Sequence, residues 1–334
     1  MIILGVDTSC DDTSVAVLDG MRAVSNIVSS QAPLHALFGG VVPEIASRKH
    51  VELIDGIYGQ ALKEAGISLA EVDVFAVTQG PGLIGSVLAG LCFVKGLTLS
   101  TGKPLVGVNH VEAHAMSIFL EEQVEFPFVS LIVSGGHTVL LLFSGPCRFH
   151  MLGGTKDDAV GEAFDKVAKH LDLGYPGGRV VEELARSGRA DSVPLPRPMM
   201  NEKNYDFSFS GLKTSFISYV KKHGVNKDNC FDVLASFQEA ACEVLTAKTV
   251  RAALDRGVRR VVVGGGVACN NRLREMLARN CAAEGISVFF PSPGLCTDNA
   301  AMIAATARFY ADRGLFSALD MRAFSRMRWS DGAC

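Results

Sequence analysis

Two histidines four residues apart carry the first chemical signal in this sequence. In the stretch VGVNHVEAHAMSI, residues 106–118, His110 and His114 flank Glu112. If this segment is helical, the two imidazoles share one face, about 5–6 Å apart at Cβ, which suits one bound cation; the same spacing also arises by coincidence on surface helices. A zinc peptidase of the HExxH type needs its glutamate directly after the first histidine. Because Glu112 is turned about 200° from His110 on a helix, that mechanism is disfavoured, and Glu112 is expected to contribute least.

A carboxylate elsewhere in the chain could complete a metal site. Asp298, in CTDNAAM, precedes a helical stretch, where it could cap the helix or act as a third, hard ligand. Two histidines and one carboxylate leave coordination positions open for a substrate, an arrangement suited to Fe(II) and compatible with Zn(II). The spacing by itself does not bring Asp298 to the two histidines.

Several turns have the composition of anion-binding loops. DTSCDDTS and SGGHT offer backbone N–H groups and hydroxyls, and Gly135 and Gly136 let a phosphate or carbonyl approach the backbone closely. GPGLIGS and GGGVACNN each join a strand to a helix N-terminus, which favours an anion or a nucleotide. Neither loop ends in the G-K-[ST] of a P-loop. Ordinary turns with local side-chain hydrogen bonds are the competing interpretation.

The strands that must position these residues form a repeated unit. Residues 2–20 read as two strands joined by a tight turn, and residues 128–145 repeat that pattern. Each half then continues with a strand, a glycine-rich loop and a helix, in residues 72–97 and 258–280. This duplication predicts an α/β protein with two lobes and a cleft between them. We expect the lobes to span residues 1–125 and 126–334, the second with a helical insertion at about 146–257.

Composition narrows the functional class. The 32 basic and 35 acidic residues give a net charge of −3, which argues against a protein that wraps nucleic acid by charge alone. Nine cysteines without a CxxC pair predict reduced thiols rather than a disulfide framework or zinc ribbon. No basic leader precedes the first strand, and we expect no apolar run to approach the roughly 18 residues of a membrane span. A soluble, cytoplasmic protein without a membrane partner is therefore expected.

Many separate motifs occur in the order of one known family. They are GVDTSCDDTSVAV, PGLIGSVLAGLCFVKGL, LVGVNHVEAH, LIVSGGHT, DDAVGEAFDKVAK, YPGG, FSFSGLKT, GGGVACN and CTDNAAMIA. Over nearly all of its length the chain resembles the TsaD (Gcp) family of tRNA N6-adenosine threonylcarbamoyltransferases. The resemblance implies an actin-like, sugar-kinase-like (ASKHA) fold of two ribonuclease-H-like lobes. It also implies the reaction, in which the threonylcarbamoyl group of threonylcarbamoyl-AMP passes to N6 of adenosine 37 in tRNAs reading ANN codons and AMP leaves.

The resemblance also assigns residues. His110, His114 and Asp298 match the family's ligands for one Fe(II) or Zn(II) ion. The implied substrate-binding positions are Ile132, Val133, Ser134, Gly135, Gly136, Asp165, Gly178, Glu182 and Asn270. Arg179, close to Glu182, departs from the family's usual PGGP. The motifs name no catalytic base, and His137 is the candidate to take a proton from the adenine amine.

The resemblance implies threonylcarbamoyl-AMP and tRNA as ligands and TsaB-like and TsaE-like proteins as partners. The weak net charge of the chain fits a need for help in holding tRNA. An actin-like ATPase or small-molecule kinase is the alternative from another class, because two lobes with phosphate-binding turns suit either activity. A nucleotide-sensing scaffold without chemistry is a third possibility.

Overall fold

A computed structural model describes residues 1–226 and 229–327, so Cys334, one of the cysteines counted above, lies outside the described residues. The chain divides into two compact units, Met1–Val124 with Thr297–Cys334, and Glu125–Cys296. The expected division placed residues 126–334 together in the second lobe. Instead, α11 (Ala300–Ala311) packs against β1 and β2 of the first unit, and the chain from Thr297 belongs there.

The first unit is built on a five-stranded sheet of order β3-β2-β1-β4-β5. Its strands are β1 (Ile2–Asp7), β2 (Asp12–Asp19), β3 (Arg22–Ser30), β4 (Val74–Gly80) and β5 (Leu105–Asn109). β1, β2 and β3 run antiparallel, whereas β1, β4 and β5 run parallel. The predicted hairpin is β1–β2. The sequence did not predict β3, because most of this edge strand is exposed or half-buried and its apolar residues occur in pairs rather than alternating with polar ones.

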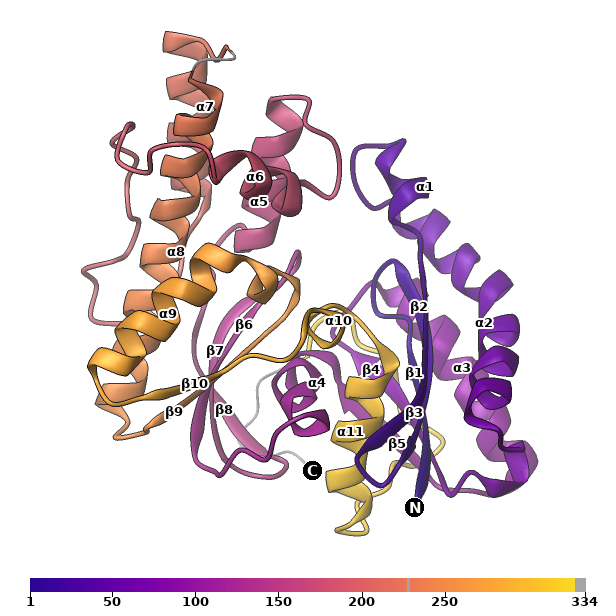
Figure 1. Ribbon diagram of the computed structural model, residues 1–334. Coiled ribbons are helices and arrows are strands. Elements are labelled where there is room, and N and C mark those ends of the chain that lie inside the picture. Colours follow the sequence, from indigo (N-terminus) through magenta and orange to yellow (C-terminus); the bar gives the residue numbers. More distant parts are fainter. Residues whose placement is uncertain (227–228, 328–334) are drawn as a thin grey trace. The chain divides into compact units, whose positions relative to one another are not determined.

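Helices cover both faces of this sheet (Figure 1). Alternate residues of β1 divide between the faces: Leu4 and Val6 lie in a core that includes residues of α2 (Pro43–Ala65) and α3 (Ile84–Thr101), whereas Gly5 lies against α11. A Cβ atom on Gly5 would lie 2.5 Å from the carbonyl oxygen of Ala300, so α11 approaches the strand backbone directly. The short helices are α1 (Ala32–Ala36), η1 (Leu69–Glu71), α4 (His110–Met116) and η2 (Ser117–Leu120).

One helix of the described chain, α3, is long and apolar enough to cross a membrane by length and composition alone. The expectation that no apolar run reaches this length was therefore wrong. In the structure α3 packs against α2 and β4. Core helices of soluble proteins can be as long and as apolar as a membrane-spanning helix. A single such helix is weak grounds for a membrane span.

The second unit repeats the strand plan of the first. Its sheet has the order β10-β9-β6-β7-β8, with β6 antiparallel to β7, β7 antiparallel to β8, and β6, β9 and β10 parallel. The strands are β6 (Phe128–Val133), β7 (Thr138–Gly145), β8 (Arg148–Gly154), β9 (Arg260–Gly264) and β10 (Ser287–Phe289). Three antiparallel strands followed by two parallel ones in each unit confirm the predicted duplication.

Helices fill the long interval between β8 and β9 (Figure 1). They are α5 (Val160–His170), α6 (Gly177–Ala185), α7 (Ser210–His223) and α8 (Cys230–Asp255). After β9 come η3 (Gly266–Cys269), α9 (Asn271–Ala283) and α10 (Pro293–Cys296). The expected insertion began at about residue 146, which is too early because β8 is still part of the sheet. A single apolar core joins these helices to the sheet of this unit.

Candidate functional site

The NHVEAH segment is helical, as the spacing of its histidines required. β5 ends at Asn109, whose Oδ1 accepts hydrogen bonds from the backbone N–H groups of Val111 (2.9 Å) and Glu112 (3.3 Å). This N-cap starts α4 at His110 and places His114 one turn later on the same face. The two imidazole ring centroids lie 4.7 Å apart at an interplanar angle of 77°.

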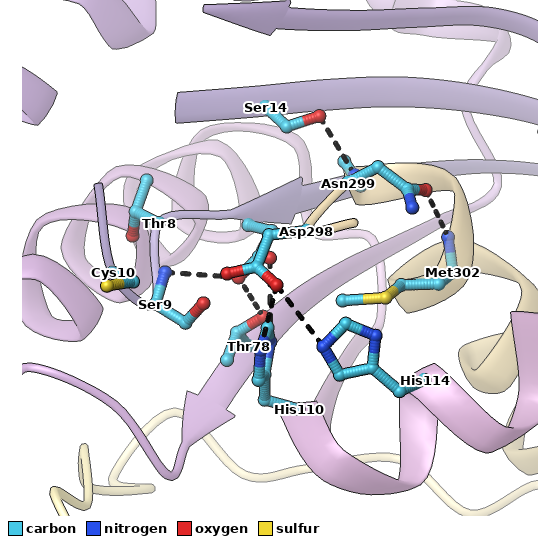
Figure 2. A network of polar contacts seen from close by, with 12 residues as sticks. Thr8, Ser9, Cys10, Ser14, Thr78, His110, His114, Asp298, Asn299 and Met302 are labelled. Atoms are coloured by element: carbon cyan, nitrogen blue, oxygen red, sulfur yellow. Dashed lines mark hydrogen bonds and ion pairs between the residues drawn. The ribbon is translucent and has the colours of Figure 1, made fainter. Parts of the chain in front are cut away.

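Asp298 lies at this histidine pair rather than capping the helix that follows it. The N-cap of α11 is Asn299, whose Oδ1 accepts the backbone N–H of Met302 at 3.0 Å. The carboxylate of Asp298 is therefore not needed as a cap. Its Oδ1 lies 3.5 Å from Nε2 of His110 and 3.2 Å from Nε2 of His114. Figure 2 shows the Asp298 carboxylate directed toward these two imidazoles.

These three side chains fit a divalent cation. One ligand atom from each of His110, His114 and Asp298 lies within 4.8 Å of the others. Both imidazoles are buried, and Nδ1 of His114 has no hydrogen-bond partner among residues 1–226 and 229–327. Two imidazoles and a carboxylate are donors that both Fe(II) and Zn(II) accept. The site therefore suits a metal ion of this class without distinguishing the two.

The electrostatics of the site favour positive charge. Burial alone would lower the pKa of His110, but the carboxylates of Asp298 and Asp7 outweigh it and raise that pKa to about 10. Burial would likewise raise the pKa of Asp298, yet His110 and His114 hold it well below its ordinary value. A cation placed among these groups gains from the same two carboxylates, and would displace the proton that His110 otherwise holds.

Asp7 also belongs to this site, although the sequence did not predict it there. Asp7 ends β1, and its Oδ1 accepts hydrogen bonds from the backbone N–H of Ser9 (3.1 Å) and the hydroxyl of Thr78 (2.7 Å). Its Oδ2 lies 3.5 Å from Nδ1 of His110. Carboxylates in this position orient metal-binding imidazoles and increase their basicity. The sequence signal that could have indicated Asp7 is its position at the end of a strand, because the parallel neighbours of that strand end at the same edge of the sheet.

We predict that Asp7→Asn weakens metal binding about 10–100-fold, the usual cost of losing such an orienting carboxylate. The amide keeps the size of the side chain but loses the negative charge that faces His110. Equilibrium dialysis against Zn(II) and Fe(II), with thermal unfolding of the metal-free protein, measures the effect. Asp19→Asn, at the end of the neighbouring strand β2 with a side chain 65% exposed, is the matched control. Equal metal affinity in both variants would contradict the assignment.

Glu112, expected to contribute least, is a buried structural residue. It is 1% exposed, and its Oε2 accepts a hydrogen bond from the hydroxyl of Tyr310 on α11 at 2.9 Å. Burial raises the pKa of this carboxyl to about 8, although the Tyr310 hydrogen bond acts in the opposite direction. Glu112 thus connects α4 to α11, which agrees with the argument against a peptidase.

The raised pKa of Glu112 predicts a pH-dependent stability. The pKa of the Glu112 carboxyl is 4.5 in an unfolded chain and about 8 in the folded protein. At a pH between these two values, Glu112 keeps its proton in the folded protein but has lost it in the unfolded chain. Stability therefore falls as pH rises through this window. We expect Glu112→Gln to remove this slope and to raise the free energy of unfolding at pH 8 by on the order of 2–4 kcal/mol.

Urea unfolding of metal-free protein at pH 5 and pH 8 measures this slope. Glu64→Gln, at an exposed position on α2, should leave it unchanged. A Glu112→Gln protein with the same pH dependence as the parent would contradict the prediction.

In the second unit, the predicted substrate loop, residues 132–136, comprises the last two residues of β6 and the turn that follows it. The turn is closed by hydrogen bonds from the backbone N–H of Ser134 to the carbonyl of His137 (2.8 Å) and from the N–H of His137 to Oγ of Ser134 (3.1 Å). The side chains of Ile132 and Val133 are fully buried, whereas the glycines at 135–136 are exposed. Any ligand contact with residues 132–136 is therefore to backbone or to Ser134. His137 is half-buried, and its role as a base stays a prediction.

Two other glycines pack directly against this turn. A Cβ atom on Gly161, in the first turn of α5, would lie 2.5 Å from the carbonyl oxygen of Ser134. A Cβ atom on Gly265, just before η3, would lie 2.3 Å from the carbonyl oxygen of Val133. The starts of α5 and η3 therefore lie beside the predicted substrate loop.

Two more of the predicted substrate-binding residues, Asp165 and Asn270, form hydrogen bonds at the starts of helices. Oδ1 of Asp165 accepts the backbone N–H of Gly177 at 2.7 Å, which fixes the start of α6 next to Gly178. Oδ1 of Asn270 caps α9, and its Nδ2 donates to Gln238 at 2.8 Å. The structure thus brings these segments into one connected set within the second unit.

Glu182 has a role that the sequence did not predict. Its Oε1 accepts hydrogen bonds from the backbone N–H (3.2 Å) and the side-chain Nδ2 (2.6 Å) of Asn271, and from Arg186 at 3.0 Å. Arg179, the departure from the family pattern, pairs instead with Glu183 at the surface. Glu182 therefore joins α6 to the start of α9, and its expected contact with a ribose stays a prediction.

Fold and site together define the class of the protein. It is an α/β protein of two ribonuclease-H-like units, the first of which carries a His/His/Asp group with both imidazoles buried. The same fold occurs in full-length HypF in the phosphate- and nucleotide-bound form, with a TM-score of 0.64 and 15% identity over 95% of this chain and 56% of that one. It also occurs in component A of the (R)-2-hydroxyglutaryl-CoA dehydratase of Acidaminococcus fermentans, with a TM-score of 0.56 and 17% identity over 93% and 99% of the two chains.

Sequence comparison identifies the family within this class. The family model TsaD, described as tRNA N6-adenosine threonylcarbamoyltransferase, matches residues 22–305. A protein of that name from Geotalea uraniireducens is 50% identical over 326 residues, which is 97% of this chain and 95% of the relative. Another from Geobacter metallireducens is 51% identical over 97% of this chain and 96% of the relative. The chain belongs to the TsaD family, as its motifs predicted.

Proposed function

We propose that the protein transfers the threonylcarbamoyl group from threonylcarbamoyl-AMP to N6 of adenosine 37 in tRNAs reading ANN codons, with release of AMP, in the cytoplasm. The observation that carries this proposal is the full-length similarity to proteins named for this transfer. The group of His110, His114 and Asp298 supports it, because one ligand atom from each of these side chains lies within 4.8 Å of the others in the first unit.

The donor is a mixed carbamoyl-phosphate anhydride and is already activated, so the protein must chiefly orient it and stabilise developing charge. An Fe(II) or Zn(II) ion held by His110, His114 and Asp298 would supply Lewis acidity and a template for the donor. Asp7 holds the ring of His110 in position for this task. Asn109 fixes the start of the helix that carries both imidazoles.

The second unit supplies groups for the nucleotide part. We assign the amides and hydroxyl of the Ser134–Gly136 turn to the phosphate, where charge develops as AMP leaves. Asp165, Gly178, Glu182 and Asn270 are assigned to the nucleoside. The adenine amine must lose a proton when the new N–C bond forms, and His137, in the same turn, is the candidate acceptor.

The protein is proposed to act with a TsaB-like protein and a TsaE-like ATPase. α2 and α3 expose large apolar side chains: Val51 is 67%, Leu88 49% and Leu99 70% exposed. Exposed apolar side chains on two helices that pack against each other suit a protein partner. With a net charge of −3 the chain is also poorly equipped to hold tRNA unaided.

Reconstitution of the transfer tests the proposal. Metal-loaded protein is mixed with threonylcarbamoyl-AMP and an unmodified tRNA, with and without the two partners and a chelator, and modified adenosine is measured by mass spectrometry of nucleosides. Transfer that the chelator abolishes is expected. Rapid ATP hydrolysis without partners, together with indifference to threonylcarbamoyl-AMP, would favour an ATPase or kinase instead. Ligand binding without turnover in any mixture would favour a scaffold.

A further inference from the structure

Two cysteines of the second unit lie against each other beside the proposed nucleotide loop. Cys269 ends η3 and Cys296 ends α10. Sγ of Cys269 lies 3.8 Å from the carbonyl oxygen of Pro293, the first residue of α10, and the two thiols influence each other's pKa. Cys269 is half-buried and Cys296 is fully buried. One thiol is therefore open to a small oxidant from solvent, while the other is within reach of the first.

An arginine holds the two segments together. Nε of Arg274 donates to the carbonyl of Ala268 at 2.6 Å, and one of its terminal nitrogens donates to the carbonyl of Pro291 at 2.8 Å. The same nitrogen lies 3.5 Å from Sγ of Cys296. A guanidinium beside a thiol pair stabilises a thiolate, the form of cysteine that reacts with oxidants.

Cys269 has the character of a reactive thiol. The hydrogen bond from Cys296 lowers the pKa of Cys269 to about 7 against the opposing effect of burial, and the charge of Arg274 acts in the same direction. By contrast, burial raises the pKa of Cys281 to about 11 and also raises that of Cys242. These two buried thiols are structural.

We propose that Cys269 and Cys296 form a peroxide-sensitive modification site. The Cys269 thiolate attacks hydrogen peroxide or an organic hydroperoxide, which gives a sulfenic acid and hydroxide or an alkoxide. The Cys296 thiol then attacks the sulfenic sulfur, which forms the disulfide and releases water. Overall two thiols are oxidised, one peroxide is reduced, and a thiol reductant reverses the change.

The disulfide would act on the proposed nucleotide loop, and this step rests on the proposed function. Cys269 directly precedes Asn270, and Gly265 at the other end of η3 touches the carbonyl of Val133 in the substrate loop. A bond to α10 draws the end of η3 closer to Cys296 and so displaces the residues between the two contacts. We therefore expect the oxidised protein to bind AMP about tenfold more weakly than the reduced protein.

The test treats the full-length protein with stoichiometric hydrogen peroxide and measures intact mass and cross-linked peptides. The parent should lose two hydrogens and yield a Cys269–Cys296 peptide pair, at a rate that rises through about pH 7. Cys296→Ser should stop at a sulfenic acid that a dimedone probe captures, and Cys269→Ser should give neither product. Cys92→Ser, which removes an exposed thiol on α3 of the other unit, should behave like the parent.

Oxidation confined to Cys92, or sulfinic acid at Cys269 without the cross-link, would overturn the proposal. AMP affinity is then measured by calorimetry on reduced and oxidised protein. Equal affinities with the disulfide formed would overturn the regulatory role alone. Absence of AMP binding by the reduced protein would count against the proposed nucleotide site, and the mass measurement would still decide the modification site.

Discussion

Replacement of His110 by alanine is expected to remove the bound metal and lower threonylcarbamoyl transfer by more than about 100-fold, since even the loss of an orienting residue costs 10–100-fold in such sites. With His110 gone, only His114 and Asp298 remain as ligands, and Asp7 faces a cavity. The buried carboxylate of Asp7 and the partly exposed carboxylate of Asp298 then lose the imidazole that compensates their charge. The metal-free variant should therefore also be less stable at neutral pH than the metal-free parent.

Asp298→Asn tests the same centre with little effect on the fold. The start of α11 is held independently, by the Asn299 cap and by a hydrogen bond from the N–H of Ala300 to Oγ of Ser14 at 2.9 Å. We expect metal content, measured by mass spectrometry, to fall while helix content stays constant. His170→Ala, at an exposed position in the other unit, should keep both metal and activity. Full transfer by metal-free His110→Ala protein would refute the metal's role.

The duplicated fold and the histidine pair were predictable because their signals are local. Strand hairpins and glycine-rich strand-to-helix loops depend on residues close in sequence, and both units show them where expected. His110 and His114 share a face because one helical turn separates them. The edge strands β3 and β8 were missed, since edge strands with exposed faces have weak apolar patterns.

The contacts of the site that join residues far apart in the sequence could not be predicted without the fold. Asp298 reaches the histidines because α11 returns to the sheet of the first unit, a topology that no local pattern predicts. The Glu112–Tyr310 hydrogen bond spans 198 residues of sequence for the same reason. Asp7 could be recognised in the sequence as an acid at the end of a strand, β1. Its partner, His110, begins α4 after a different strand, β5, so the sequence did not show that the two residues meet. Packing, rather than spacing, decides these contacts.

Replacement of Gly161 by alanine is expected to lower AMP affinity more than tenfold and transfer about 100-fold, the cost of misplacing a binding group by about 1 Å. The backbone of Gly161 is in an ordinary helical conformation, so alanine itself would favour the helix. The obstacle is the neighbouring turn. The added Cβ would lie 2.5 Å from the carbonyl oxygen of Ser134 and 2.9 Å from Cα of Gly135, and backbone atoms of a closed turn cannot rotate away.

Gly211→Ala provides the matched comparison for Gly161→Ala. Gly211 also lies in the first turn of a helix of the same unit, α7, and a Cβ atom there would meet only a side-chain carbon of Pro198 at 3.9 Å. This variant should bind AMP normally and unfold at the same or a slightly higher temperature. Calorimetric titration with AMP and thermal unfolding of both variants separate a displaced loop from a lost fold. If Gly161→Ala folds and binds AMP as tightly as Gly211→Ala, the Ser134–Gly136 turn does not hold the nucleotide, and the assignment of the phosphate to this loop fails.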